Sequence, residues 1–290
     1  MLRRMDSWYF YTVMALLLLG TQRFLYKVAA EQQCSSALTS TVFMASVTLL
    51  SAAAFLTTSE PLGRPSTLLL LALLNSCSFA FATITHIEAL KRLPAGVTFP
   101  LTRLSLVVVI CFSLLYLDER LEPLQWLGVL CGFAVVLILA QDAKRETRSQ
   151  PNLRAGLLLV AICILCGAVA SISSKLAAES VNKAAFMTVS YLFGTIFSLG
   201  IELKWGRKTP SGRSQTAVVL GLLMGGLNFV GFYAFLSALA RGPLSAIALI
   251  TGMHFVIAIV LAVVVYREKM TLQRAFGIGM TLLSVYLLKH

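Results

Sequence analysis

The chain repeats part of its own sequence after 149 residues, and this duplication constrains the fold more than any other feature. The motif Ala-Leu-x-Arg-x-Pro at 89–94 recurs at 238–243, and Lys-x-Ala-Ala-Glu at 27–31 recurs at 175–179 with a shift of 148. Further matches at the shift of 149 are Thr102 with Thr251, Glu119 with Glu268, and Gly128 with Gly277. Shared proline, arginine, glutamate and glycine in one register indicate one structural unit that is built twice.

The composition places both copies in a membrane. Hydrophobic residues make up 58% of the chain and charged residues 12%, with a mean hydropathy of +0.85, whereas about 25% of a soluble domain is charged. Apolar windows of about 20 residues, the length of a transmembrane helix, lie near 7–26, 35–57, 66–90, 95–117, 123–140, 154–178, 184–203, 215–240, 243–266 and 271–289. We therefore predict an all-α, multi-pass integral membrane protein with ten transmembrane helices, located in the cell (inner) membrane.

Five windows fall in each copy, and this odd number predicts that the second copy inserts upside down. The result is a pair of inverted five-helix repeats related by a pseudo-two-fold axis in the membrane plane. The polar stretch 141–152 separates them, so the expected domains are 1–145 and 150–290. In transporters of this design the substrate site lies near the midplane between the repeats.

The formal net charge of +12 does not indicate nucleic-acid binding. The basic residues gather in short loops, for example 144–148 and 204–208, where they set topology and contact anionic lipid headgroups. Cys163 and Cys166 have no second Cys or His pair at metal-binding spacing, so neither a metal nor a cofactor is expected. The expected partners are a small-molecule substrate and the lipid bilayer, with no nucleic acid.

The loop charges also bear on orientation. With the N-terminus in the cytoplasm, seven Lys and Arg residues would lie inside and thirteen outside. Because cytoplasmic loops normally carry the excess of Lys and Arg, this count favours the opposite orientation.

The chain resembles the EamA type of the drug/metabolite transporter superfamily. The resemblance is carried by the two five-helix copies, by the Ala-Leu-x-Arg-x-Pro motif that enters the fourth and ninth spans, and by Glu119 and Glu268, which close those spans. It implies a ten-helix transporter whose central cavity is formed mainly by the first, third, fourth, sixth, eighth and ninth helices. It also implies peripheral fifth and tenth helices and both termini in the cytoplasm, which is contrary to the charge count.

Small residues spaced four apart mark the two helices that the resemblance makes peripheral. Gly128 and Gly132 lie in the fifth span, and Gly277 and Thr281 occupy the matching places in the tenth. Such spacing lets two helix backbones approach closely in lipid, and we expect it to serve packing rather than ligand contact. A dimer formed through the fifth and tenth helices is a further expectation.

Ionisable groups deep in the membrane are the first candidates for the site, because an arginine at the bilayer centre costs about 3 kcal/mol on insertion scales. Arg103 lies eight residues into the fourth span, or about 12 Å deep at 1.5 Å per residue. His254 lies eleven residues into the ninth span, and its counterpart in the repeat is Ser105. Each faces either the cavity or a structural partner: an ion pair for Arg103 and a hydrogen bond for His254.

Other polar residues follow from the same reasoning. Asn75 and Asn228 lie near the middle of the third and eighth spans, where they would bind substrate or bridge helices. His86 lies one turn before the end of the third span, and Arg23 lies near the end of the first. The predicted substrate-binding residues are Arg103, His254, Asn75, Asn228, Arg23, His86, Thr102 and Thr251.

No Asp or Glu falls in the middle of any span. A pump for cationic drugs needs a buried carboxylate, so that function is disfavoured. The deep basic groups instead predict a neutral to positive cavity, in which Arg103 and His254 hold a carboxylate or another anion. We therefore predict a secondary transporter of a small metabolite, with an amino acid or organic anion moved outward by alternating access. A His254 proton switch and simple facilitated flux both stay open as modes of coupling.

Two other classes of function would require different features of this sequence. A flippase for a lipid or lipid-linked sugar would share the architecture and use basic residues at a cavity mouth. An intramembrane enzyme would need a nucleophile with a base or a metal set, yet the chain has no Gly-x-Ser-x-Gly and no His-Glu-x-x-His motif. The chain is therefore predicted not to be an enzyme.

Overall fold

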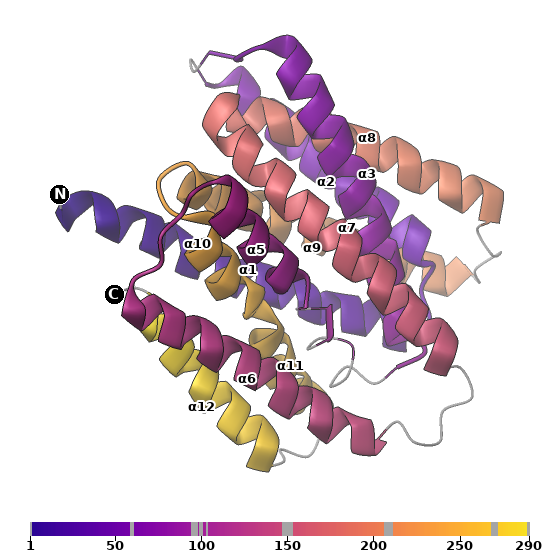
Figure 1. Cartoon of the computed structure of the whole chain (residues 1–290). Helices are drawn as coiled ribbons and strands as arrows, with labels where there is room; N and C mark the ends of the chain where they lie inside the picture. Colours follow the sequence, from indigo (N-terminus) through magenta and orange to yellow (C-terminus); the bar gives the residue numbers. More distant parts are fainter. Residues whose placement is uncertain are drawn as a thin grey trace.

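The computed structural model describes residues 2–58, 61–93, 98, 101–102, 104–146, 153–205, 211–267 and 272–288. Within these ranges the secondary structure consists of helices joined by turns and short connections, with one isolated β-bridge between Gly63 and Val181. The helices in chain order (Figure 1) are α1 (Leu2–Glu31), α2 (Ser36–Leu56), α3 (Pro65–Leu90), α5 (Ser105–Tyr116), α6 (Pro123–Glu146), α7 (Leu153–Ser180), α8 (Lys183–Trp205), α9 (Ser211–Leu239), α10 (Leu244–Gly252), α11 (His254–Tyr266) and α12 (Leu272–Leu287).

Seven helical segments are long and apolar enough to cross a membrane: α1, α2, α3, α7, α8, α9, and α10 together with α11. Shorter apolar helices at Ser105–Tyr116, Pro123–Val135 and Ala275–Ser284 lie in the three remaining predicted windows. The prediction of an all-helical, multi-pass membrane protein is thus confirmed. The count of ten complete spans stays a prediction, because in the described part of the chain three windows hold only the shorter apolar stretches.

The helix contacts have the symmetry of the sequence repeat. α1 of the first half packs on α9 of the second, and α7, the counterpart of α1, packs on α3, the counterpart of α9. α2 pairs with its own counterpart α8, and α6 pairs likewise with α12. The fourth and ninth spans, which also correspond, meet through α5 and α10. These pairings are therefore retained when the two halves are exchanged.

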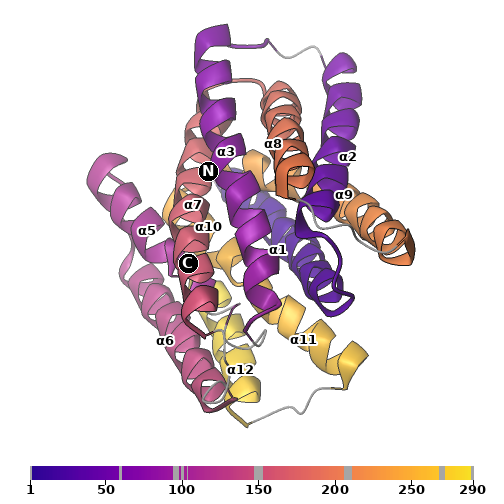
Figure 2. The same ribbon diagram turned by 90° about the vertical axis from the view of Figure 1, so that its right-hand side faces the viewer.

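α6 and α12 pack against each other at the edge of the molecule, as both views show (Figures 1 and 2). A Cβ at Gly128 would lie 2.9 Å from Leu288, and one at Gly132 would lie 3.4 Å from Ser284. The Ser284 hydroxyl also donates a hydrogen bond of 2.6 Å to the Gly128 carbonyl. The packing role predicted for this glycine pair is therefore confirmed inside one chain. A dimer through α6 and α12 stays a prediction, and the glycine face is already used by α12.

The turn between α9 and α10 is held by two opposite charges from other elements. Lys175 of α7 donates to the carbonyls of Leu239, at 3.0 Å, and Gly242, at 3.1 Å. Glu119, in the connection between α5 and α6, accepts the main-chain N–H groups of Leu244, at 2.6 Å, and Ser245, at 3.0 Å. The cation thus meets the negative end of α9 and the anion meets the positive end of α10. Glu119 therefore has a structural role in this turn, while its counterpart Glu268 lies outside the described residues.

Candidate functional site

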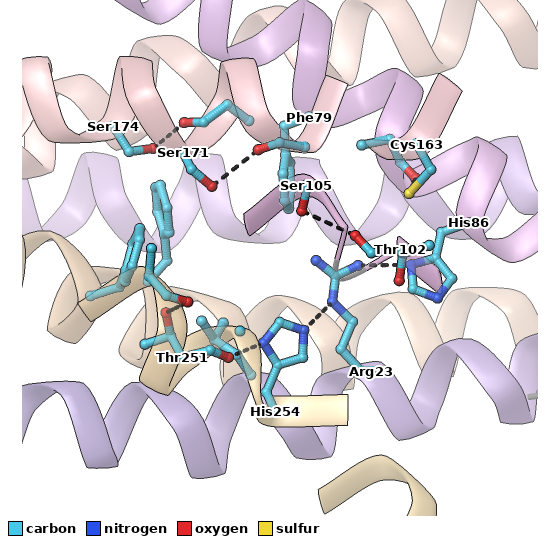
Figure 3. A pocket seen from close by; sticks show the side chains of 18 of the residues that line it. Arg23, Phe79, His86, Thr102, Ser105, Cys163, Ser171, Ser174, Thr251 and His254 are labelled. Carbon is cyan, nitrogen blue, oxygen red and sulfur yellow. Dashed lines mark hydrogen bonds between the residues drawn. The ribbon is translucent and has the colours of Figure 1, made fainter. Parts of the chain in front are cut away.

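A cavity of about 120 Å³ lies between the two halves. The first half lines it with α1, α3, Thr102 and α5, and the second half lines it with α7, α9, α10 and α11 (Figure 3). These elements belong to the first, third, fourth, sixth, eighth and ninth spans, which are the six that the family resemblance implied. Each copy of the repeat therefore supplies the same three spans to one shared cavity.

The fourth and ninth spans are both interrupted beside this cavity, at the same place in the repeat. α5 begins at Ser105 and α11 begins at His254, which is 149 positions later. Just before each start, a tight turn is closed by a bond to the third residue back: Leu104 N to Leu101 O at 3.0 Å, and Met253 N to Ile250 O at 3.1 Å. The predicted windows 95–117 and 243–266 treated these spans as unbroken, since a turn made of apolar residues leaves no mark on hydropathy.

The side chains at the two starts make equivalent contacts. The Ser105 hydroxyl donates to the main-chain carbonyl of Thr102 at 3.0 Å, and the His254 Nδ1 is hydrogen-bonded to the main-chain carbonyl of Thr251. All four residues line the cavity. The first turns of two half-helices therefore reach the cavity from opposite copies, and the N-terminal end of a helix carries partial positive charge.

Arg23 of α1 is the cation at the centre of the site. Its Nε donates to His254 Nε2 at 3.1 Å, and its Nη1 lies 3.5 Å from His86 Nδ1 (Figure 3). Its Cζ also lies 4.8 Å from the centroid of the Tyr26 ring, a cation–π distance. Among the described residues that line the cavity, none is Asp or Glu. The guanidinium is therefore held by aromatic and imidazole groups, and no described carboxylate on the cavity wall neutralises it.

These contacts fix the state of the His254 ring. Because a carbonyl oxygen only accepts, the His254 Nδ1 beside Thr251 O carries a proton. Because Arg23 Nε donates, His254 Nε2 accepts through its lone pair. The imidazole is thus neutral, with its single proton turned away from Arg23. The sequence placed His254 at mid-membrane but gave no reason to pair it with a residue on the first span.

Asn75 bridges helices at the cavity wall. Its amide nitrogen donates to Ala170 O at 2.8 Å and lies 2.9 Å from the Ser174 hydroxyl, both on α7. Its carbonyl oxygen accepts from Ser190 of α8 at 2.9 Å. The helix-bridging interpretation of Asn75 is therefore confirmed, although the residue also lines the cavity.

Asn228 belongs to a chain of polar groups that ends beside Arg23. Tyr191 donates to its carbonyl oxygen at 2.5 Å, and its amide donates to Gln22 at 3.0 Å. Gln22 in turn donates to the Tyr26 hydroxyl at 3.3 Å. Gln22, Tyr26 and Tyr191 were not among the predicted residues. Gln22 could have been found as a buried amide next to Arg23, whereas a tyrosine in an apolar span gives no comparable signal.

The structure gathers the predicted residues in one place. The cavity is lined by Arg23, Asn75, His86, Thr102, Asn228, Thr251 and His254. Arg103, the residue expected to hold the anion, lies outside the described residues. Among the described residues, Arg23 is the arginine that contacts His254. The role of these residues in binding substrate stays a prediction.

The fold and the cavity define a class of protein: a multi-pass, helical membrane protein with a polar site shared by two halves. The sequence model of the EamA-like transporter family matches residues 6–141 and 154–289, one stretch in each predicted half. The chain therefore belongs to the EamA-like transporter family, and the predicted resemblance is confirmed. This membership supports a membrane transporter of small molecules.

Two further comparisons bear on the fold. A crystal structure that is 19% identical in sequence superposes with a TM-score of 0.77, and the match covers 97% of this chain and 96% of the other. At that identity the likeness supports the fold alone. A search of curated proteins gave no match.

Proposed function

We propose that the protein transports a small metabolite that carries a carboxylate, an amino acid or an organic anion, outward across the cell membrane by alternating access. Arg23 binds the anionic group, and the spans of the two repeats rock around it. The observation that carries the proposal is the position of Arg23: a guanidinium on the wall of a cavity between the halves, where no described lining residue is acidic.

The surroundings of Arg23 favour an anion further. The half-helices α5 and α11 begin with Ser105 and His254, both on the cavity wall. Their N-terminal dipoles add positive potential, and the electrostatic attraction is stronger there than in water because the site is desolvated. An organic cation would meet Arg23 with no described carboxylate on the wall to balance it.

The size of the cavity bears on the alternative of a flippase. Sites for drug-sized ligands occupy about 300–1,000 Å³, whereas this cavity measures about 120 Å³. It suits a solute of a few heavy atoms and is too small for the headgroup of a lipid-linked sugar. The volume of the cavity in this conformation therefore supports a small metabolite as the substrate.

Counterflow in proteoliposomes tests the proposal. Purified protein is tested with amino acids, organic acids, nucleosides and quaternary amines, and Arg23→Gln, Arg23→Lys and Arg64→Gln are compared with the wild type. Arg64 is exposed at the start of α3, so Arg64→Gln removes the same charge far from the cavity.

We expect Arg23→Gln to reduce carboxylate counterflow about 10- to 100-fold, as for loss of a charged hydrogen bond. Arg23→Lys should keep part of the activity, because an ammonium retains the charge but not the planar fork. Arg64→Gln should behave as the wild type. Carboxylate counterflow by Arg23→Gln at the wild-type rate would refute the proposal, as would transport restricted to cations. Transport rates measured with the substrate gradient directed first outward and then inward test whether the protein favours the outward direction.

A further inference from the structure

The contact between Arg23 and His254 leaves one place for an additional proton. The His254 Nδ1 proton is engaged by the carbonyl of Thr251, and Nε2 accepts from Arg23 at 3.1 Å. A second proton on this ring can bind only at Nε2. It would displace the Arg23 hydrogen bond and set two cations side by side.

The groups around His254 determine what such a proton would meet. Among the described residues that line the cavity, the charged or titratable side chains are Arg23 on α1, His86 on α3, Cys163 on α7 and His254 itself. The lining residues from α5, α9 and α10 are not titratable, and residues 123–140 of α6 include no charged residue. Tyr26 of α1 contacts the guanidinium through its ring. Arg103, a further cation in the sequence, lies outside the described residues.

The empty cavity therefore opposes a second positive charge, because it holds one cation and no described anion. Two unit charges about 3 Å apart repel strongly in a medium of low polarity. A bound carboxylate changes this balance, since it takes the guanidinium as its partner and brings one negative charge. His254 Nε2 is then released from Arg23 and can bind a proton. The resulting N–H group donates a hydrogen bond to the same carboxylate.

We propose that the transporter carries a proton at His254 Nε2 together with each anion, and so works as an anion–proton symporter. This inference rests on the proposed function of the cavity. The proton comes from water on the side where the anion binds and returns to water on the side where the anion leaves. An O–H bond of a hydronium ion breaks as the Nε2–H bond forms, and the reverse occurs when the proton is released. A monovalent carboxylate and one proton together make the cycle electroneutral.

Thermodynamic linkage gives this coupling a measurable form. If the anion favours protonation of His254, the proton must favour binding of the anion by the same factor. The apparent affinity for the carboxylate should therefore fall as the pH rises, by at most about tenfold per pH unit for one proton. A pH gradient should also drive accumulation of the anion on the alkaline side. Outward transport then requires an outward anion gradient that exceeds any opposing pH gradient.

The test uses the wild-type protein in proteoliposomes that contain a pH-sensitive dye. Inward movement of a carboxylate should acidify the lumen with one proton per anion, and an imposed pH gradient should drive uptake. His254→Gln is the matched variant, because its amide can accept from Arg23 and donate to Thr251 but cannot bind a proton. Any residual carboxylate uptake by His254→Gln should be independent of pH and carry no protons. Arg64→Gln, at an exposed site outside the cavity, should keep the proton flux.

The outcomes separate the two proposals. Net carboxylate uptake that needs Arg23 but moves no protons in the wild type would overturn the symport proposal and leave the proposed function standing. Proton-driven accumulation that persists in His254→Gln would overturn it as well. Carboxylate counterflow that does not need Arg23 would refute the proposed function itself. Even if His254→Gln does not fold, the wild-type proton-to-anion ratio decides whether a proton moves with each anion.

Discussion

Ser105 and His254 occupy the same position in the two copies of the repeat, and each hydrogen-bonds the main-chain carbonyl three residues before it. The break in the fourth and ninth spans is therefore a feature of the duplicated unit. The two side chains differ in chemistry: the hydroxyl of Ser105 donates its one proton to a local bond, while the second nitrogen of His254 reaches Arg23. Both copies of the repeat line the cavity. At this position the two copies differ, and the second carries the histidine that we propose to bind a proton.

The two broken spans touch each other at Gly252, and this contact can be tested by compensation. A Cβ at Gly252 would lie 2.6 Å from Leu106 Cδ1 of α5. Gly252→Ala should therefore push the two spans apart at the cavity and reduce transport several-fold. Leu106→Ala should relieve the overlap, so the double variant should transport better than Gly252→Ala alone. Strictly additive losses would contradict the contact.

Adjacent glycines on α9 offer a matched test of helix packing. A Cβ at Gly225 would lie 2.4 Å from the Ser46 Cβ on α2, whereas a Cβ at Gly226 would meet nothing within 4 Å. Gly225→Ala should lower the thermal midpoint in detergent, because overpacking costs about 1–3 kcal/mol. Gly226→Ala should be neutral or raise it, since alanine is favoured over glycine in a helix by about 1 kcal/mol. Equal midpoints for the two variants would argue against this α2–α9 interface.

Glu119 predicts a dependence of stability on pH. Burial alone would raise the pKa of its carboxyl, but hydrogen bonds from Ser113, Ser245 and the main chain of Leu244 outweigh burial and lower it from 4.5. A carboxyl whose pKa is lowered by folding stabilises the folded state above its ordinary pKa, and this contribution is lost as the pH falls through the folded value. Stability should therefore fall on acidification below about pH 4.5.

Glu119→Gln should be less stable than the wild type near neutral pH by about 1–2 kcal/mol, the usual worth of a helix cap. It should also lose part of the acid dependence, which thermal melts between about pH 7 and about pH 3 would measure. Glu122→Gln is the control, because Glu122 is exposed in the same connection. The prediction is wrong if both variants follow the wild-type curve.

Lys175 should hold the turn between α9 and α10 against α7 and so limit access to the cavity from that end. Lys175→Met removes the donor to the carbonyls of Leu239 and Gly242, and loss of a buried charged hydrogen bond costs about 1.5–3 kcal/mol. We expect a lower thermal midpoint and faster labelling of a cysteine introduced at Ser171, a cavity residue, after the native cysteines are replaced. Lys204→Met, at an exposed site, should change neither. Unchanged labelling in Lys175→Met would contradict this role.

Much of the site could be predicted from the sequence, because the depth of a residue in the membrane follows from its position along an apolar helix. Arg23, His86 and His254 were selected as ionisable groups within apolar windows, and the structure places all three together. Thr102 and Thr251, which match in the repeat, both line the cavity, and each accepts a hydrogen bond on its main-chain carbonyl. Arg23 was placed only near the end of the first span, and its pairing with His254 could not be foreseen, since those residues are 231 positions apart.

Taken alone, the amino-acid sequence determined that the chain is helical, lies in a membrane, and consists of one unit built twice. These properties depend on composition, on the length of apolar runs and on a shared register, all of which are local. The tertiary structure decided which face each polar residue presents and where the fourth and ninth spans break. The physical reason is that these helices are apolar around most of their circumference, so hydropathy does not set their rotation. Only contacts between helices, such as those of Asn75 and Arg23, fix that rotation.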